Sequence, residues 1–373
     1  MNNKVLIAFL LCHVSAVALG QADNVILVTI DGLRWQEVFR GLDPVLAQDE
    51  QYSERQEMLA EKWGDAPDGS ALMPFLHEVV FTQGSVIGNR DAGSCAHVTN
   101  PWYFSYPGYN EILTGFADPA IDSNNPVPNP NVTFLEWLQN TDARFDGKVA
   151  AFASWNVFPA ILNMARSGVP VNIGKLADAD SDEELLLNRL HDEILSPWPT
   201  VRLDAFTHHY ALSAMRYDHP RVLYIAYGET DDFAHDGEYD QYVLAAHRTD
   251  RNLAALWEQV QSDPFYRDHT VMFITVDHGR GETPAETWQH HASKESLSGY
   301  MEALAQYENG IEGSNAVWMA AIGPGVAGNG LIANSGCAGS NQVAATLLQL
   351  LGKDPQAFSA KAGMPLSEML VAS

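Results

Sequence analysis

The sequence predicts an open α/β fold, in which a mostly parallel sheet carries helices on both faces. Two observations support this prediction. Five short runs are apolar at nearly every position, which is typical of parallel strands covered by helices on both sides. Segments with helical periodicity lie between these runs, and such alternation favours this architecture. The length of 373 residues and the hydrophobic content of 46% suffice for a sizeable core.

Each element is predicted from a local pattern. The expected strands are 24–32, 148–155, 221–232, 270–279 and 316–325. The expected helices are 70–84, 131–140, 181–196, 240–264 and 341–354. Ser181 is a plausible N-cap because acidic residues follow it in the first turn. Three polar or Pro-rich stretches are interpreted as insertions over one rim of the sheet: 42–69, 117–131 and 155–220.

The first 22 residues predict a secretory signal peptide. They contain one Lys, an apolar stretch and a small-residue end, so cleavage is expected near Ala22. Residues 23–373 are then expected to form a single domain, exported to the periplasm or secreted. The apolar part of the signal is short for a membrane span, and no later stretch approaches 18 uninterrupted apolar residues. The sequence therefore predicts no membrane span in the mature chain.

The chain is strongly acidic, with a formal net charge of −26. Removing residues 1–22 removes Lys4 and no acid, so the mature chain is more acidic still. Such a surface is not expected to bind nucleic acid polymers. A small anionic substrate would need a local positive charge, and bound metal ions could supply it.

Two cysteines remain after the signal peptide, Cys95 and Cys337. In an exported protein they could form a disulfide, or they could remain free thiols, and the sequence leaves both alternatives open. The sequence has no Cys-x-x-Cys motif, which argues against a thiolate zinc site.

Three of the apolar runs end in acidic residues: Asp31, Asp231 and Asp277. In open α/β sheets, ligands bind at the carboxyl ends of the strands, so these acids are expected to converge on one crevice. Unpaired carboxylates would repel one another there, which predicts a cation among them.

Histidines accompany these acids. His235 follows Asp231 by four residues, His278 adjoins Asp277, and His290 and His291 come shortly afterwards. Imidazole and carboxylate together suit zinc, and they are also acceptable to manganese. The remaining histidines of the mature chain lack acids at strand ends, and we interpret them as surface or packed residues.

A candidate nucleophile lies in "FSYPGYNEILTG" (104–115), where Ser105 precedes a helix-like run. A serine at a helix N-terminus lies where amide donors and the helix dipole favour negative charge. Metal coordination would lower the pKa of its hydroxyl further. The alternative is a simple helix cap, since Ser is among the preferred capping residues. No Gly-x-Ser-x-Gly motif is present, which argues against a serine-triad esterase.

The order of these motifs resembles the alkaline phosphatase superfamily. Within it, the chain looks most similar to the type I phosphodiesterase/nucleotide pyrophosphatase branch, from about residue 24 to 352. The motifs that carry the resemblance are Asp31-Gly-Leu-Arg34, Ser105 ten residues before Gly115, Asp231-x-x-x-His235, Asp277-His278-Gly279 and a late histidine. The resemblance implies a two-metal hydrolase of phosphate esters, either diesters or monoesters, with Ser105 as nucleophile and a phospho-enzyme intermediate.

The resemblance also implies which residues hold each ion. Asp31, Asp277 and His278 would hold one metal, which Ser105 would contact. Asp231, His235 and the late histidine would hold the other. His291 is the expected late ligand, with His290 as the alternative. The expected ions are two Zn²⁺, with Mn²⁺ next.

The chain departs from its relatives at the nucleophile. Similar nucleotide pyrophosphatases have Thr followed by Phe-Pro-Asn, whereas this chain has Ser105-Tyr-Pro-Gly. That puts nucleotide diester specificity in doubt. The family also uses an Asn after the nucleophile's helix to hold phosphoryl oxygens, and Asn124 or Asn125 lies in that loop.

Two other functions remain open. Sulfatases of the superfamily modify Cys or Ser in a Cys/Ser-x-Pro-x-Arg context, but Tyr109 stands where the Arg should be. A catalytically silent metal-binding or carbohydrate-binding protein could also retain the fold.

Aromatic and basic residues near these motifs have two interpretations. Trp102, Tyr103, Tyr106 and Tyr109 flank the nucleophile, and they could stack on a substrate or simply pack. Arg34 and Arg280 could likewise meet the substrate or pair with a local acid.

Overall fold

The structure, a computed structural model, describes residues 21–372, so nearly all of the predicted signal peptide lies outside the described residues. Eight strands form one sheet in the order β10-β2-β9-β7-β1-β6-β4-β5, and three form a small second sheet in the order β11-β3-β8. The strands are β1 (Asn24–Ile30), β2 (Ser85–Ile87), β3 (Cys95–His97), β4 (Val149–Ala153), β5 (Val171–Asn172), β6 (Val222–Tyr227), β7 (Thr270–Thr275), β8 (Ala316–Val317), β9 (Met319–Ile322), β10 (Gly330–Leu331) and β11 (Cys337–Gly339).

The large sheet is mostly parallel, which confirms the predicted fold class. Strand β1 lies at its centre, and its Val28 pairs with Ile225 of β6 and Ile274 of β7, both in parallel register. All seven residues of β1 are buried, as expected for a strand covered on both faces.

The run 316–325 differs from its prediction as a parallel strand. It divides between two sheets: Ala316–Val317 is β8 of the small sheet, and Met319–Ile322 is β9 of the large one. Strand β9 runs antiparallel to both of its neighbours, β7 and β2. An apolar run buried on both faces does not specify strand direction, which depends on the connection that precedes the strand.

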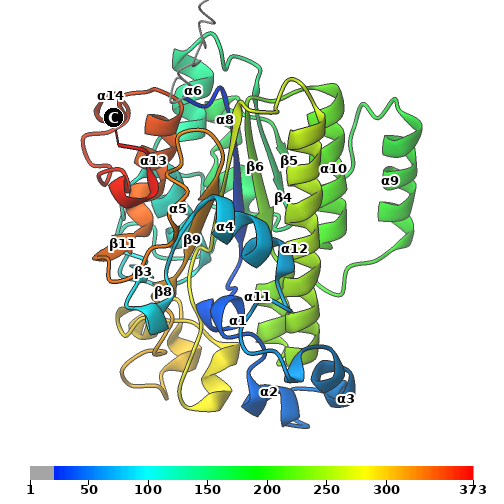
Figure 1. Cartoon of the computed structure of the whole chain (residues 1–373), viewed down its shortest axis with the longest axis vertical. Coiled ribbons are helices and arrows are strands. Elements are labelled where there is room, and N and C mark those ends of the chain that lie inside the picture. Colours follow the sequence, from blue (N-terminus) through cyan, green and yellow to red (C-terminus); the bar gives the residue numbers. More distant parts are fainter. Residues whose placement is uncertain (1–20, 373) are drawn as a thin grey trace, which may run out of the picture.

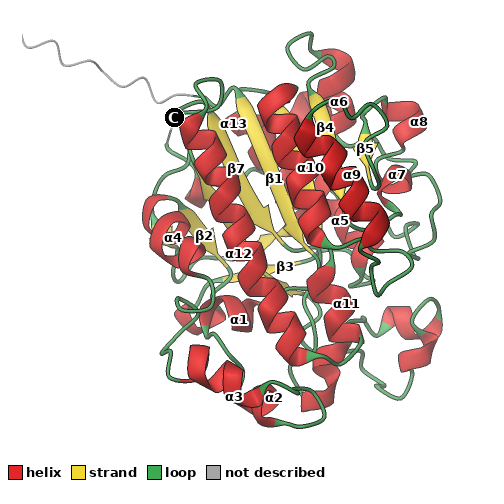
Figure 2. Ribbon diagram, turned by 90° about the vertical axis from the view of Figure 1, so that its right-hand side faces the viewer, coloured by secondary structure: helices red, strands yellow, loops and turns green. Residues whose placement is uncertain are grey.

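Helices cover both faces of the sheet. In Figure 1, α10 and α12 lie on one side of the strands, and α5 and α13 lie on the other; Figure 2 shows α10 and α12 crossing the sheet face-on. The helices are α1 (Trp35–Phe39), α2 (Pro44–Gln48), α3 (Gln56–Leu59), α4 (Phe81–Gln83), α5 (Ser105–Thr114), α6 (Phe134–Thr141), α7 (Phe158–Ile161), α8 (Met164–Ser167), α9 (Asp182–Glu193), α10 (Asp204–Tyr217), α11 (Glu229–His235), α12 (Tyr239–Ser262), α13 (Val343–Leu350) and α14 (Pro355–Phe358).

The predicted helices are present, with boundaries that shift by a few residues. Ser181 caps α9 as expected: it forms a capping box with Glu184, in which each side chain accepts from the other residue's backbone. The predicted helix 70–84 is irregular, since it has π-helical turns over Leu76–Val80 before α4.

Helix α10 belongs to the core, so the segment 155–220 is more than the rim insertion that its sequence predicts. It packs against β4 and β6 and buries Phe206, Tyr210 and Met215. Polar residues also occupy its buried face, including Thr207, His208 and Ser213. They interrupt the apolar stripe that would have revealed the helix.

His208 should make the protein sensitive to acid. Burial, and then the charge of His209, lower the pKa of His208 to about 3, and its Nδ1 lies 2.9 Å from Tyr227 Oη. The unfolded chain binds the proton near its ordinary pKa of 6.5, so stability is complete above that pH and is lost as the pH falls. At pH 5, we expect the shifted pKa of His208 to lower the free energy of unfolding by about 2 kcal/mol relative to pH 8. Urea unfolding at pH 8 and pH 5 measures the loss, and His208→Asn should reduce it; an unchanged acid slope would contradict this account.

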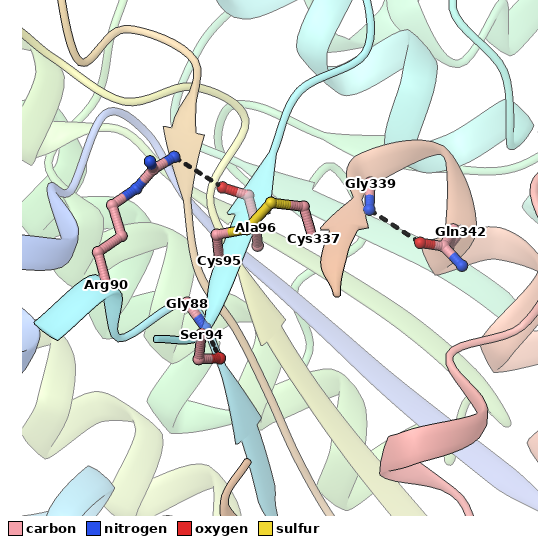
Figure 3. Close-up of a disulfide and its surroundings, with 8 residues drawn as sticks. All are labelled: Gly88, Arg90, Ser94, Cys95, Ala96, Cys337, Gly339 and Gln342. Carbon is pink, nitrogen blue, oxygen red and sulfur yellow. Dashed lines mark hydrogen bonds between the residues drawn. A yellow bond between two sulfur atoms is a disulfide. The ribbon is translucent and has the colours of Figure 1, made fainter. Parts of the chain in front are cut away.

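Cys95 and Cys337 form a disulfide between β3 and β11, so the structure selects the paired alternative. Figure 3 shows the bond beside two local contacts: Arg90 donates to the Ala96 carbonyl, and Gln342 accepts from the Gly339 amide. The two cysteines pair in parallel register, and β8 runs antiparallel on the other side of β3. The small sheet therefore joins segments separated by 242 residues.

Within residues 21–372, the structure has no helix long and apolar enough to cross a membrane.

Candidate active site

The candidate site lies at the carboxyl ends of β1, β6 and β7, the end at which α1 and α11 lie in Figure 1. Asp31 directly follows β1, and Asp277 lies two residues beyond β7. Asp231 differs from its prediction as a strand-end residue, because β6 ends at Tyr227 and Asp231 lies in the first turn of α11. The three acids nevertheless converge, as the rule for open α/β sheets predicts.

The first cluster consists of Asp31, Asp277 and His278, all buried. His278 Nε2 lies 3.2 Å from Asp31 Oδ1 and 3.4 Å from Asp277 Oδ2. Each carboxylate is also anchored by its second oxygen: Tyr109 Oη donates to Asp31 Oδ2 at 2.8 Å, and the Gly32 amide donates to Asp277 Oδ1 at 3.2 Å. The two anchors leave one oxygen of each acid directed at His278.

These remaining oxygens fit a divalent cation. Asp31 Oδ1 and Asp277 Oδ2 are buried and have no hydrogen-bond partner. A buried carboxylate oxygen without a partner is costly, so such an atom calls for an ion or another donor. Two carboxylate oxygens and one imidazole nitrogen are a suitable donor set for zinc or manganese.

The pKa shifts of the first cluster also indicate that a cation would stabilise it. Burial, followed by the charge of Asp231, raises the pKa of Asp31, and burial with the charge of Asp31 raises that of Asp277 well above its ordinary value. Burial lowers the pKa of His278, but the negative charges of Asp277 and Asp31 outweigh burial and raise this pKa to about 9. A dication would replace this proton, because metal ligands bind in their deprotonated forms.

Ser105 is the first residue of α5, and its Oγ lies 3.3 Å from His278 Nε2. Ser105 is not a helix cap, because the N-cap residue is Phe104, which provides no side-chain cap. The hydroxyl therefore faces the first cluster, and it is almost fully buried.

Gly108 explains the unusual sequence of α5, the helix that begins with Ser105. A Cβ at this position would lie 2.3 Å from the Asp277 carbonyl oxygen, closer than any real Cβ contact. The absence of a side chain lets α5 pack directly onto the backbone that carries the metal-ligand candidates. Because α5 packs against the Asp277 backbone, Ser105 at the start of α5 lies beside His278.

We expect Gly108→Ala to lower kcat/KM by about 100-fold, because α5 must move away from Asp277 and small displacements of reacting groups are costly. Ala favours an isolated helix over Gly by roughly 1 kcal/mol, so a loss would reflect the collision rather than helix propensity. The matched control is Gly174→Ala, since a Cβ there would meet nothing within 4 Å. Equal activity in the two variants would contradict the packing argument.

The second predicted cluster consists of Asp231, His235 and His291, whereas the ligand atoms that lie close enough together to share one ion are those of Asp231, His278 and His291. Asp231 and His235 are separated by one helical turn on α11, and His235 Nε2 lies 3.3 Å from Asp231 Oδ2. His291 Nε2 lies 3.1 Å from His235 Nε2 and 3.6 Å from Asp231 Oδ1. His290 is only half-buried, and its ring centroid lies 6.5 Å from that of His235. The structure therefore brings His291, the expected late histidine, into this cluster.

Backbone carbonyls orient two of the imidazoles. His278 Nδ1 lies 2.9 Å from the Gly279 carbonyl, and His291 Nδ1 lies 3.2 Å from the Tyr103 carbonyl. When Nδ1 donates to these carbonyls, Nε2 of each ring is free to bind a metal ion. Tyr103 has a φ of 58°, an uncommon conformation for an aromatic residue.

Asn124 rather than Asn125 contacts helix α5. Its Oδ1 accepts from the Tyr106 amide at 2.9 Å, which leaves its Nδ2 available as a donor. The packing interpretation also holds for two aromatic residues. Tyr106 Oη donates to the Val127 carbonyl, and Tyr109 Oη donates to Asp31; both rings are buried.

The two arginines pair with local acids. Buried Arg34 contacts Glu37 and donates to the Gly281 carbonyl at 3.1 Å. Arg280 contacts Asp231. Asp31 accepts two further hydrogen bonds that the sequence did not predict. Tyr109 donates to its carboxylate and Thr230 to its carbonyl, and no sequence motif marks either contact.

Solved structures place this fold within a known class. The wild-type alkaline phosphatase PafA matches with a TM-score of 0.57 at 10% identity, over 95% of this chain and 100% of its own. BT1596, a 2-O GAG sulfatase, matches with a TM-score of 0.55 at 14% identity, over 93% of this chain and 73% of the sulfatase. A protein in the alkaline phosphatase superfamily from Vibrio parahaemolyticus matches with a TM-score of 0.52 at 14% identity, over 94% of this chain and 71% of the Vibrio protein.

The chain thus has the fold of the alkaline phosphatase superfamily, as the order of its motifs predicted. The same fold is found in phosphatases and sulfatases, so it does not assign the chain to the phosphodiesterase branch. No family model and no curated protein sequence matches the chain.

Proposed function

We propose that this protein is an exported, metal-dependent hydrolase of phosphate esters that uses Ser105 as its nucleophile. The observation that carries the proposal is the position of Ser105 Oγ, 3.3 Å from His278 Nε2, beside two buried carboxylate oxygens that have no hydrogen-bond partner. A nucleophile in such a position has its substrate's phosphorus within reach of the same cluster.

The proposed reaction proceeds in two displacements. Ser105 Oγ forms a bond to phosphorus as the ester bond breaks, and the leaving alcohol departs with a proton. Water then attacks the phosphoserine, which releases phosphate or a phosphomonoester and restores the hydroxyl. Asn124 Nδ2 is free to donate to a phosphoryl oxygen, since its Oδ1 is held by the Tyr106 amide.

Two divalent ions complete the proposed site, Zn²⁺ first and Mn²⁺ next. Asp31, Asp277 and His278, with Ser105, would hold one, and Asp231, His235 and His291 would hold the other. Bound there, the ions would supply Lewis-acid stabilisation of phosphoryl charge and would lower the pKa of the nucleophile.

The substrate is proposed to be a small phosphate diester or monoester rather than a nucleic acid polymer, given the net charge of −26. Export to the periplasm or secretion is supported by the disulfide, since disulfides persist in oxidising compartments.

The test is release of p-nitrophenol from a phosphate monoester, a phosphodiester and a sulfate ester by zinc- and manganese-loaded protein. Hydrolysis of either phosphate ester supports the proposal, and the faster one identifies the subclass. Activity at background on all three would favour the silent-protein alternative.

A sulfatase is the second candidate, because a sulfatase shares the fold and Ser105 occupies the nucleophile position. Against it, Tyr109 replaces the Arg of the modification motif and is buried against Asp31. The intact mass of the Ser105 peptide separates the two: an unmodified serine excludes a formylglycine enzyme.

A further inference from the structure

Arg280 lies beside the second cluster of the site, where it contacts Asp231. Its side chain is fully buried, and its guanidinium contacts three different groups. Nε donates to the Trp288 carbonyl at 2.9 Å, Nη2 contacts the Gln289 carbonyl, and Nη1 contacts Asp231 Oδ1. A Cβ on Gly32 would lie 2.8 Å from both Nη1 and Asp231 Oδ1, so the ion pair is enclosed.

This contact gives the two clusters different charges. The first cluster has two carboxylates, and among the described residues they form ion pairs only with His278. The second cluster has one carboxylate, Asp231, which is already paired with Arg280. Arginine remains protonated in proteins, so this positive charge is permanent.

A permanent cation beside one cluster must oppose a second cation there. Coulomb repulsion between buried charges a few ångströms apart is only weakly reduced by solvent.

We infer that the two metal sites have unequal affinity: the Asp31–Asp277–His278 site loads first and tightly, and the Asp231–His235–His291 site loads second and weakly because Arg280 already neutralises Asp231. The inference rests on the metal sites of the proposed function, but it concerns binding rather than turnover. The second ion would then respond to the supply of metal outside the cell, while the first remains bound.

Titration of the metal-free full chain with Zn²⁺ and with Mn²⁺, followed by calorimetry and metal analysis, tests the order of loading. We expect two binding classes that differ at least about tenfold in Kd. Asp231→Asn should remove the weak class and Asp31→Asn the tight one. Two equal classes, or loss of the weak class in Asp31→Asn, would overturn the inference.

Two substitutions separate the charge of Arg280 from its positioning role. Arg280→Met removes both the charge and the hydrogen bonds, whereas Arg280→Lys keeps the charge and loses the planar fork. We expect Met to tighten the weak class at least about tenfold and Lys to leave it unchanged. If both variants weaken that class, Arg280 only positions the 288–289 backbone, and the inference is wrong.

The two proposals can fail separately. Two unequal metal classes in a protein that hydrolyses no ester would sustain the unequal sites and remove the proposed activity. If Arg280→Met does not fold, as judged by circular dichroism, the Asp31→Asn and Asp231→Asn titrations still decide the order of loading.

Discussion

Replacing Ser105 with alanine is expected to lower kcat/KM for phosphate ester hydrolysis by at least about 10³-fold, the scale of losing a nucleophile from an otherwise intact site. The hydroxyl faces His278, and it makes no helix cap, so its removal should leave the fold unchanged. The measurement is p-nitrophenol release by wild type and variant at matched metal content.

Two controls make this result specific. Ser298→Ala removes an exposed hydroxyl that donates to the Glu295 carbonyl, its one hydrogen bond among the described residues, and the variant should retain wild-type activity. Acid quenching during turnover should trap phosphate on the peptide that contains Ser105. A variant that keeps more than about a tenth of wild-type kcat/KM would instead indicate direct attack by water, without a covalent intermediate.

The sequence predicted which acids meet in the candidate site because topology or helical spacing fixes the positions of Asp31, Asp277 and Asp231. Asp31 and Asp277 follow central strands, and the ends of adjacent parallel strands necessarily meet. Asp231 and His235 share one face of α11 through their four-residue spacing. These arguments need only the local pattern and the general architecture of α/β sheets.

Other features depend on tertiary contacts that no local pattern contains. His290 and His291 differ by one position, and only the loop after Gln289 determines which ring meets Asp231. The partner of Arg280 is 49 residues away along the chain. Helix α10 went unrecognised because polar side chains such as His208 occupy its buried face.

The disulfide gives the second large effect. Replacing Cys95 and Cys337 with serine is expected to lower the unfolding free energy by about 5 kcal/mol in the loop-entropy model, because the bond closes a loop of 242 residues. Urea unfolding of wild type and of the double variant measures this difference. Two reactive thiols in the denatured, unreduced wild type would contradict the pairing.

The same variant should retain its kcat under native conditions, although β3 leads directly to the nucleophile. The intervening segment is held by a separate anchor: Glu111 of α5 accepts from the Thr99 amide at 2.7 Å and the Asn100 amide at 2.8 Å. Since this anchor belongs to the same helix as Ser105, the approach to the nucleophile is fixed without the disulfide. We therefore expect kcat within about twofold of wild type at 25 °C, and the change confined to stability. A large fall in kcat in fully folded protein would show that the small sheet, rather than Glu111, positions Ser105.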